Sequence, residues 1–581
     1  MMKSHKPRLL LALLGGMIVL SEPSYAQQSS SSGELLYNGI RLPADWPPRQ
    51  QKLTRQPMAV PYLQQPPDVI PINLGRQLFV DDFLVAQTNL RRRFHQAKYH
   101  SACPVLKPDR DWEKQAGPPT AMVFSDGVWY DPIDQLFKMW YMGGYCRSVC
   151  YAQSKDGIHW EKPALDVQPG TNVVWQGARD SNTVWLDWEE KDPQRRWKLF
   201  TTTSSREGWR LSLFVSADGI HWKGPVASSP PVHDRTTVFY NPFRKVWVYS
   251  IRTNYPGLGR VRLYREHPDA QAGLHWKQED LRLWIGADQL DPHNPNPELA
   301  QVEPQLYNLD CFPYESLLVG LFSIWQGDWH SVGKRFQKRN EVFVGFSRDG
   351  FHWDRPWRKP LFGVDERPGA WNWANVQSCG GGCLVVGDHL YFYLSAREQN
   401  AQTGQLTTGL AILRRDGFAS MEADQQEGFL ITRPVRFDGK YLFVNLQTGE
   451  EGYLLAEVLD EKGLPIAPFL KTNCEPIRGD KTLTSVHWKG VEDLSALAGR
   501  AVRFRFFLRN GSLYAFWVSP DQDGASYGYV AAGGPGLPGP IDTVGRKSDR
   551  PLPPGPKAAQ QPFQGTKSFD WVSKFCVSSA E

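Results

Sequence analysis

One heptapeptide occurs three times in this chain, and its spacing constrains the fold more than any other feature. It reads Ser-Lys-Asp-Gly-Ile-His-Trp at 154–160, Ser-Ala-Asp-Gly-Ile-His-Trp at 216–222 and Ser-Arg-Asp-Gly-Phe-His-Trp at 347–353. The first two copies are 62 residues apart, and the third follows after about twice that interval. A degraded copy, Gly-Leu-His-Trp at 273–276, fills the gap, and a fifth, Arg-Asp-Gly-Phe, follows at 415–418. The chain therefore contains five copies of one structural unit.

Each copy predicts a small β-sheet. An Asp-Gly turn followed by a Trp is typical of a hairpin whose outer strand packs on the next sheet. Two strand-like runs precede every turn, so each unit supplies about four strands. Because a radial array protects the edges of so many sheets, we expect an all-β fold with a five-bladed β-propeller at residues 72–420. An irregular stack of hairpins in a sandwich is the alternative. The runs are 121–130 and 136–142, 183–188 and 197–202, 236–240 and 246–251, 305–312 and 317–324, and 382–386 and 389–395.

The rest of the chain is too long to belong to one core, since single cores stop growing at roughly 250 to 300 residues. Strand-like runs continue after the repeat and predict a β-sandwich module at residues 421–520. Residues 521–581 are rich in Gly, Pro and polar residues, which predicts a disordered tail. Residues 27–71 have a similar composition and predict a flexible segment.

The N-terminus predicts export. Residues 1–26 combine a basic start, a short apolar run and the exit Ser24-Tyr25-Ala26, which is typical of a secretory signal peptide. The apolar run falls well short of the roughly 20 residues that span a bilayer, so we expect no membrane span. The mature protein is therefore expected in the periplasm or outside the cell.

Export permits disulfides, and two pairs of cysteines are close in sequence. We expect Cys146 with Cys150, and Cys379 with Cys383, to form local disulfides. Zinc is the less favoured alternative, because no His stands at a matching spacing beside either pair. The remaining cysteines have no assignable partners; they are Cys103, Cys311, Cys474 and Cys576.

Charge and motifs exclude several kinds of partner. The formal net charge of +5 is dispersed along the chain, so no nucleic-acid partner is expected. No motif indicates a cofactor or a catalytic metal, although a structural calcium on the propeller axis stays possible. The oligomeric state is left open by the sequence.

The repeat and the strand pairs at 127–131 and 136–141 resemble the five-bladed propeller glycosidases of glycoside hydrolase families 32 and 43. The resemblance covers residues 78–421 and is architectural. The Trp-Met-Asn-Asp-Pro-Asn-Gly stretch of invertases is absent, as is their Glu-Cys pair, so a separate branch is implied. In the resembling families three consecutive blades supply Asp, Asp and Glu at the starts of their innermost strands. The resemblance thus implies a carbohydrate substrate.

At the corresponding positions of blades two, three and four this chain carries Asp180, Asp234 and Glu303. Cleavage of a glycosidic bond needs one carboxylic acid to protonate the leaving oxygen and one carboxylate on the other face. A third carboxylate can raise the pKa of the acid. We therefore expect Asp180 to act as base or nucleophile, Asp234 to orient or tune, and Glu303 to act as acid. The alternative is that all three serve turns and ion pairs.

Five further residues are predicted to bind the substrate. Arg235 follows Asp234 and could hold a hydroxyl, a carboxylate or a sulfate. Two tryptophans in loop-like stretches could stack on sugar faces. The other two are polar residues at the starts of innermost strands. The full set is Glu113, Arg235, Trp325, Trp373 and Gln377.

The function predicted from these features is hydrolysis of glycosidic bonds in a plant or algal polysaccharide or oligosaccharide. Two alternatives remain. A non-catalytic glycan-binding propeller would keep aromatic and Arg contacts but lack a matched carboxylate pair. A glycoside phosphorylase would need one acid and a group of cationic side chains for phosphate, although an export signal argues against phosphate-dependent chemistry.

Overall fold

The computed structural model describes residues 33–115, 117–205, 208–327, 336–373, 375–378, 380–399 and 404–545. The predicted signal peptide and the last 36 residues of the predicted tail, 546–581, lie outside these ranges. The described chain is nearly all β. Its one α-helix, α1 (Pro61–Gln64), is a single turn. None of the described helices is long and apolar enough to cross a membrane.

Five antiparallel sheets surround one axis and confirm the predicted five-bladed propeller. Blades one to four contact each other through their innermost strands. The innermost strand of blade five lies against the third strand of blade four, and blade five also contacts the innermost strand of blade one. The strands of blade one are β6 (Ala121–Asp131), β7 (Leu136–Gly143), β8 (Ser148–Ser154) and β9 (Val173–Gln176). Those of blade two are β10 (Arg179–Leu186), β11 (Trp197–Ser205), β12 (Gly208–Ser216) and β13 (Lys223–Val232). Those of blade three are β14 (Thr237–Asn241), β15 (Val246–Tyr255), β16 (Gly259–His267) and β17 (Arg282–Gly286).

Each of the last two blades includes a strand from a distant part of the chain. Blade four has β18 (Gln305–Glu315), β19 (Leu317–Trp325) and β20 (Asn340–Ser347), and the C-terminal β31 (Tyr529–Val530) pairs with the end of β18. In blade five the innermost strand is split into β21 (Asn375–Gln377) and β22 (Cys383–Val386), followed by β23 (His389–Arg397) and β24 (Leu406–Arg414). The N-terminal β5 (Lys98–Tyr99) is its outer strand. Hydrogen bonds between the two ends of the propeller segment therefore close the ring.

The repeated heptapeptide links neighbouring blades. In the second copy the Asp218 carboxylate accepts hydrogen bonds from the amides of Ile220 (2.8 Å) and His221 (2.9 Å). Gly219 has a φ of +81°, a conformation that favours glycine. Its carbonyl accepts a hydrogen bond of 2.6 Å from the Trp140 indole of the preceding blade. The Trp140 contact explains why the turn recurs: it fixes one sheet against the next.

Gly219→Ala should lower the free energy of unfolding by about 2–4 kcal/mol, because a Cβ would clash as well as strain the backbone. That Cβ would lie 2.4 Å from Cζ2 of Trp140. Gly170→Ala is the matched control, because Gly170 has a φ of +79° but no atom within 4 Å of its added Cβ. Denaturant unfolding of both variants measures the difference. Equal losses would show that the contact between blades contributes nothing.

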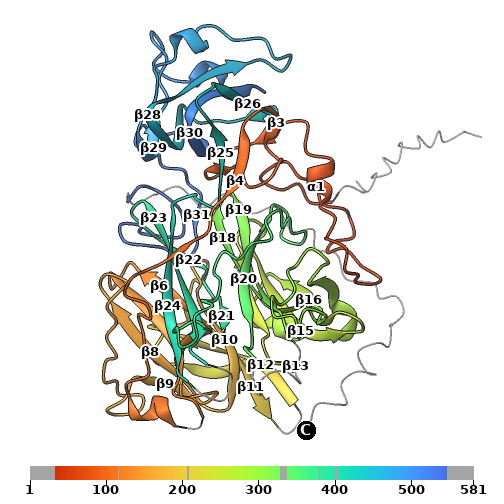
Figure 1. The fold of residues 1–581 in the computed structure, drawn as a ribbon, viewed down its shortest axis with the longest axis vertical. Coiled ribbons are helices and arrows are strands. Elements are labelled where there is room, and N and C mark those ends of the chain that lie inside the picture. Colours follow the sequence, from red (N-terminus) through yellow and green to blue (C-terminus); the bar gives the residue numbers. More distant parts are fainter. Residues whose placement is uncertain are drawn as a thin grey trace, which may run out of the picture.

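The second module is built from both ends of the chain (Figure 1). Its eight-stranded sheet is organised around two long paired strands, β28 (Tyr441–Leu459) and β30 (Arg503–Ser519). N-terminal strands pair with strands that follow the propeller: β3 (Val85–Thr88) pairs with β26 (Gly428–Thr432), and β4 (Arg91–Phe94) pairs with β25 (Ala419–Ala423). The all-β fold class predicted from the sequence, a propeller followed by a sandwich module, is confirmed. The other strands of this sheet are β2 (Gln77–Leu78) and β29 (Asp480–Ser485).

The predicted flexible segments need correction. From residue 33 onward the N-terminal segment is packed, with Leu36 and Ile70 buried in the core of the second module. The Tyr37 hydroxyl donates to the carbonyl of Ser316, at 2.5 Å. Residues 521–545 are also ordered, with Asp542 fully buried. Both segments are rich in Gly, Pro and polar residues, but their apolar side chains pack on surfaces that other parts of the chain provide.

The predicted disulfide between Cys146 and Cys150 is wrong, because both thiols are free. Cys150 is buried in blade one, with its sulfur against Gly143, whereas Cys146 lies in the β7–β8 turn. Cys383 is likewise free, and its predicted partner Cys379 lies outside the described residues.

A buried charge cluster joins the two modules. Its two arginines face three carboxylates: Arg76 lies 2.9 Å from Asp416 and 3.4 Å from Glu315, and Arg415 lies 2.6 Å from Asp542. Burial, opposed in part by Arg76, raises the pKa of Glu315 to about 7. Glu315 is therefore the carboxylate of the cluster that gains a proton as the pH falls to about 7.

The Glu315 pKa makes stability depend on pH. Its folded-state pKa lies above its ordinary value of 4.5, so the folded protein binds the extra proton between pH 7 and 4.5. The wild-type free energy of unfolding should therefore fall by up to about 3 kcal/mol between pH 5 and pH 8 through this group. Glu315→Gln should lack this fall, because any change that the amide makes to the free energy of unfolding is the same at both pH values. Denaturant unfolding at the two pH values tests it, and parallel pH dependences would rule out Glu315 as the source.

Candidate active site

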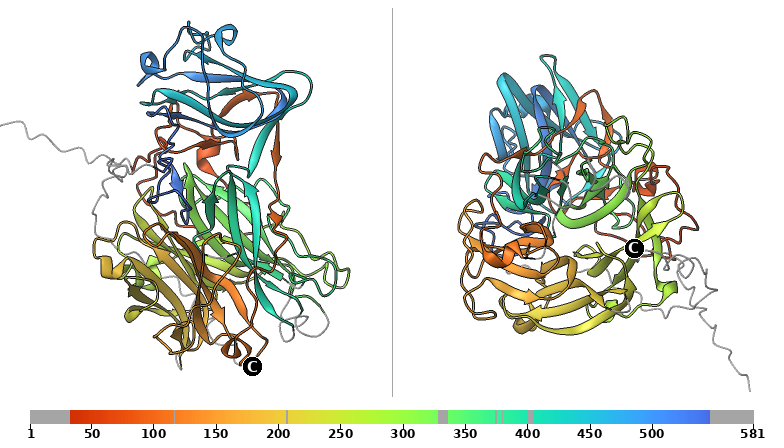
Figure 2. Two further views of the ribbon diagram at one scale, coloured as in Figure 1. Left: turned by 90° about the vertical axis from the view of Figure 1, so that its left-hand side faces the viewer. Right: turned by 60° about the horizontal axis from the view of Figure 1, so that its bottom comes forward.

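The propeller has one free end. The last residues of β18, Tyr314 and Glu315, pair with β31 and lie against the second module, so the innermost strands begin at the opposite end. Figures 1 and 2 show the second module stacked on one end of the propeller. The starts of the innermost strands therefore meet at the end that the module leaves uncovered.

Two of the predicted carboxylates come together at this end. Asp180 is the second residue of β10, and Asp234 lies just before β14 in the next blade. The amide of Arg235 donates to Oδ1 of Asp180 at 3.1 Å, which holds the two segments side by side. The Asp234 carboxylate forms an ion pair with Arg252, with 3.1 Å between Oδ1 and the guanidinium nitrogen.

The surroundings separate the pKa values of the two carboxyls. Burial, reinforced by the charge of Asp234, raises the pKa of Asp180. Burial alone would also raise the pKa of Asp234, but Arg252, Arg260 and Lys338 hold it below its usual range. Two neighbouring carboxyls whose pKa values are moved apart are an arrangement that acid–base chemistry uses. Asp180 is therefore the member of the pair that binds a proton more readily; the sequence predicted it as base or nucleophile.

Cationic side chains from two blades act on this pair, and one from a third blade acts together with Asp180 on the neighbouring Cys146. Arg235 and Arg252 come from blade three, with Arg260 at the start of β16. Lys338 lies just before β20 of blade four, and Arg397 ends β23 of blade five. Sequence reasoning found Arg235 and missed the other four, because they lie at the ends of second strands or the starts of third strands.

Tyr307 is a further group that the sequence did not reveal. It lies near the start of β18, and its hydroxyl accepts a hydrogen bond of 3.0 Å from Lys338. Arg260 lies over its ring at 5.2 Å. Burial alone would raise the pKa of Tyr307, but Lys338, Arg235 and Arg260 hold it below its usual range. Tyr307 therefore lies in a strongly positive environment next to the carboxyl pair.

Three predicted site residues do not belong to this arrangement. Glu303 lies in the loop before β18 with its side chain 53% exposed, and it pairs with Arg55 instead of the two aspartates. Glu113 is fully enclosed, and its carboxylate already accepts hydrogen bonds from Tyr141 and two backbone amides. Trp325 is 1% exposed within β19, so its faces are unavailable for a sugar. These three assignments are corrected to packing and ion-pair roles.

The other two predicted binding residues stay candidates. Gln377 ends β21 near the axis, 1% exposed, and its Oε1 has no partner among the described residues. Trp373 is half-buried in the loop before β21, and its carbonyl accepts a hydrogen bond from Gln337 at 3.0 Å. Within the described ranges no group of three or more His, Cys, Asp and Glu residues is placed to hold a metal ion.

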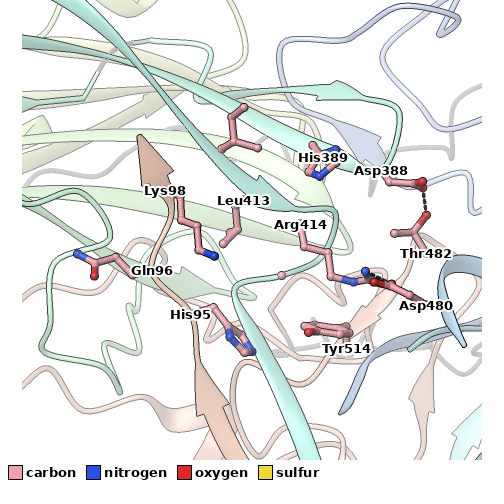
Figure 3. A pocket seen from close by; sticks show the side chains of 12 residues that line it. His95, Gln96, Lys98, Asp388, His389, Leu413, Arg414, Asp480, Thr482 and Tyr514 are labelled. Carbon is pink, nitrogen blue, oxygen red and sulfur yellow. Dashed lines mark hydrogen bonds and ion pairs between the residues drawn. The ribbon is translucent and has the colours of Figure 1, made fainter. Parts of the chain in front are cut away.

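A hollow of about 590 Å³ lies at the seam between blade five and the second module, away from the axial carboxyl pair (Figure 3). Its carboxylates are already engaged: Asp480 pairs with Arg414, and Asp388 accepts from the Thr482 hydroxyl. His95 is hydrogen-bonded to Ser420 at 2.8 Å. No two carboxyls here face each other in contrasting surroundings, so the axial end is the better candidate for catalysis.

No protein-family model matches this sequence, and no curated protein matches it. Among solved structures, it is similar to an N-acetylgalactosamine deacetylase from F. plautii in complex with blood group B trisaccharide. That similarity has a TM-score of 0.36 and 14% identity, over 60% of this chain and 97% of the other. A thermostable family-43 glycoside hydrolase gives a TM-score of 0.35 and 12% identity, over 53% and 92%.

A putative glycoside hydrolase from Bacteroides ovatus is also similar, with a TM-score of 0.34 and 13% identity over 55% of this chain and 97% of the other. These structures include a member of family 43, which the repeat resembles. At TM-scores this low, these similarities carry no argument about the substrate of this chain.

Proposed function

We propose that this protein is a glycoside hydrolase with its active site at the free end of the propeller. The observation that carries the proposal is the pair Asp180 and Asp234, which adjoin at that end with their pKa values moved in opposite directions. Asp180 donates its proton to the leaving glycosidic oxygen. Asp234, kept ionised by Arg252, attacks the anomeric carbon or takes a proton from the attacking water. The substrate is a plant or algal polysaccharide or oligosaccharide, and the leader at residues 1–26 directs the protein out of the cytoplasm.

A glycoside phosphorylase is the second candidate, because the cations around the carboxyl pair could hold phosphate. A non-catalytic glycan-binding propeller has less support. Such a protein has no need of two adjoining carboxyls with opposed pKa shifts, whereas a glycosidase requires them.

The test is release of reducing sugar by the purified protein from plant and algal polysaccharides and aryl glycosides, with and without inorganic phosphate. Cleavage without phosphate is the expected result. Cleavage that depends on phosphate and yields a sugar phosphate would establish the phosphorylase. Binding of a glycan with no cleavage of any substrate would contradict both enzymatic functions.

A further inference from the structure

Positive charge exceeds negative charge around the axial carboxyl pair. Five cations lie there, Arg235, Arg252, Arg260, Lys338 and Arg397, while Asp234 is the carboxyl whose pKa is lowered. Two deeper carboxyls on the axis do not offset them. The first, Asp126, is held by both terminal nitrogens of Arg179 at 2.6 Å. The second, Asp310, accepts from Asn308 (2.8 Å) and Ser378 (2.7 Å), and burial raises the pKa of both carboxyls.

Several of these cations have nitrogens without an acceptor. Arg235 is 0% exposed, and none of its three side-chain nitrogens has a hydrogen-bond partner in the described part of the chain. Its guanidinium lies 3.8 Å from the ring centroid of Phe124, so the ring covers one face of the guanidinium. Arg397 is 3% exposed, with Nε and Nη1 also lacking partners. Because an unsatisfied buried guanidinium is costly, these nitrogens fit a ligand that brings acceptor oxygens.

The same cations lower the pKa values of nearby neutral and basic side chains. The pKa of Tyr307 is held below its usual range although burial alone would raise it. Burial and the charge of Arg252 lower the pKa of His233 to about 4. Burial and the charge of Arg235 lower the pKa of Arg262 to about 9. An enclosed site with this potential attracts anions and disfavours further cations.

We propose that the axial site binds an oxyanion, with Lys338 and Arg397 as its direct ligands and Arg235 as the cation beneath it. The oxyanion is a carboxylate or sulfate ester on the substrate sugar, or free inorganic phosphate beside a neutral sugar. Planar guanidinium groups bind all of these through paired N–H···O contacts. The inference deepens the proposed function and rests on it, since it names the chemistry of the ligand at the same site.

The experiment measures binding by titration calorimetry, on full-length mature protein carrying Asp180→Asn to prevent turnover. Three probes are compared: oligogalacturonides against uncharged galactose oligomers, sulfated against desulfated oligosaccharides, and inorganic phosphate alone. Lys338→Met and Arg397→Gln should each weaken binding of the anionic probe about tenfold or more, since each removes a charge-assisted contact. Affinity should also fall as salt rises. The control is Arg436→Gln, whose side chain is exposed on β27 (Val435–Arg436) of the second module.

The outcomes separate the sources of the oxyanion. Preference for a charged glycan over its neutral counterpart, lost in Lys338→Met, places the oxyanion on the sugar. Binding of phosphate alone, lost in the same variant, makes it a free anion. Equal binding of charged and neutral probes, or no effect of either substitution in folded protein, overturns the inference even if the wild type cleaves glycans. Tight binding of an anionic glycan that the wild type never cleaves would instead contradict the proposed hydrolase and leave the oxyanion site intact.

Discussion

Asp234→Asn should lower kcat about a hundredfold to ten-thousandfold on every glycoside that the wild type cleaves. The amide cannot attack the anomeric carbon or accept a proton from water. A better leaving group does not replace this nucleophile or base, so the loss should be similar on all substrates. Asp180→Asn should behave differently. It should lose as much on a natural glycan, whose alkoxide leaving group needs a proton, but keep most of its activity on a dinitrophenyl glycoside, whose phenolate leaves without one. Initial rates on the two substrates distinguish the roles.

The pH dependence gives an independent check of the same assignment. The active form has Asp234 ionised and Asp180 protonated, so the rate should fall below the lowered pKa of Asp234 and above the raised pKa of Asp180. On the dinitrophenyl glycoside, which needs no proton from Asp180, the fall at higher pH should be weak in the wild type and absent in Asp180→Asn. Glu303→Gln serves as the control, because the half-exposed Glu303 pairs with Arg55 and should leave kcat unchanged. A loss in Glu303→Gln as large as in Asp234→Asn would restore Glu303 as a catalytic residue.

The repeat predicts the propeller because its turn is local. Asp218 and Gly219 form a turn whose hydrogen bonds join residues within four positions of each other. Such local contacts can be predicted from the sequence without knowledge of the rest of the fold. The second module is different. Pairing of β3 with β26 joins residues more than 300 positions apart, and nothing local in either strand identifies its partner. For the same reason residues 33–71, which are anchored by surfaces formed later in the chain, were predicted to be flexible.

The candidate site was predictable to the extent that it lies at the starts of innermost strands. Asp180 and Asp234 were found by that rule. The rule gave the wrong residue in blade four: the side chain near the axis is that of Tyr307, four positions after Glu303. Arg252 and Arg397 were missed since each lies at or near the end of the second strand of its blade, β15 or β23, which the rule did not consider. A comparison of the residues at the ends of the second strands of all five blades would have found both arginines.

Arg76→Met should lower the free energy of unfolding by about 3–5 kcal/mol at pH 8, the second large effect expected. Arg76 is fully buried and contacts Glu315, Asp416 and Asp542, which belong to blade four, the last turn of the propeller and the C-terminal segment. Without it, three carboxylates share the single cation of Arg415. Methionine fills much of the volume against Trp517, whose ring lies 4.2 Å from the guanidinium, so the loss reports mainly charge.

The pH dependence of this loss separates charge from packing. Glu315 already has a pKa raised to about 7, and removal of Arg76 takes away the main charge that opposes the rise. At pH 5 the variant can protonate Glu315 and relieve the repulsion, so the difference between variant and wild type should shrink. Denaturant unfolding at pH 5 and pH 8 measures it, with Arg436→Gln as the exposed control. A loss of the same size at both pH values would mean that the cluster stabilises the junction through packing against Trp517, and that its buried charges are balanced without Arg76.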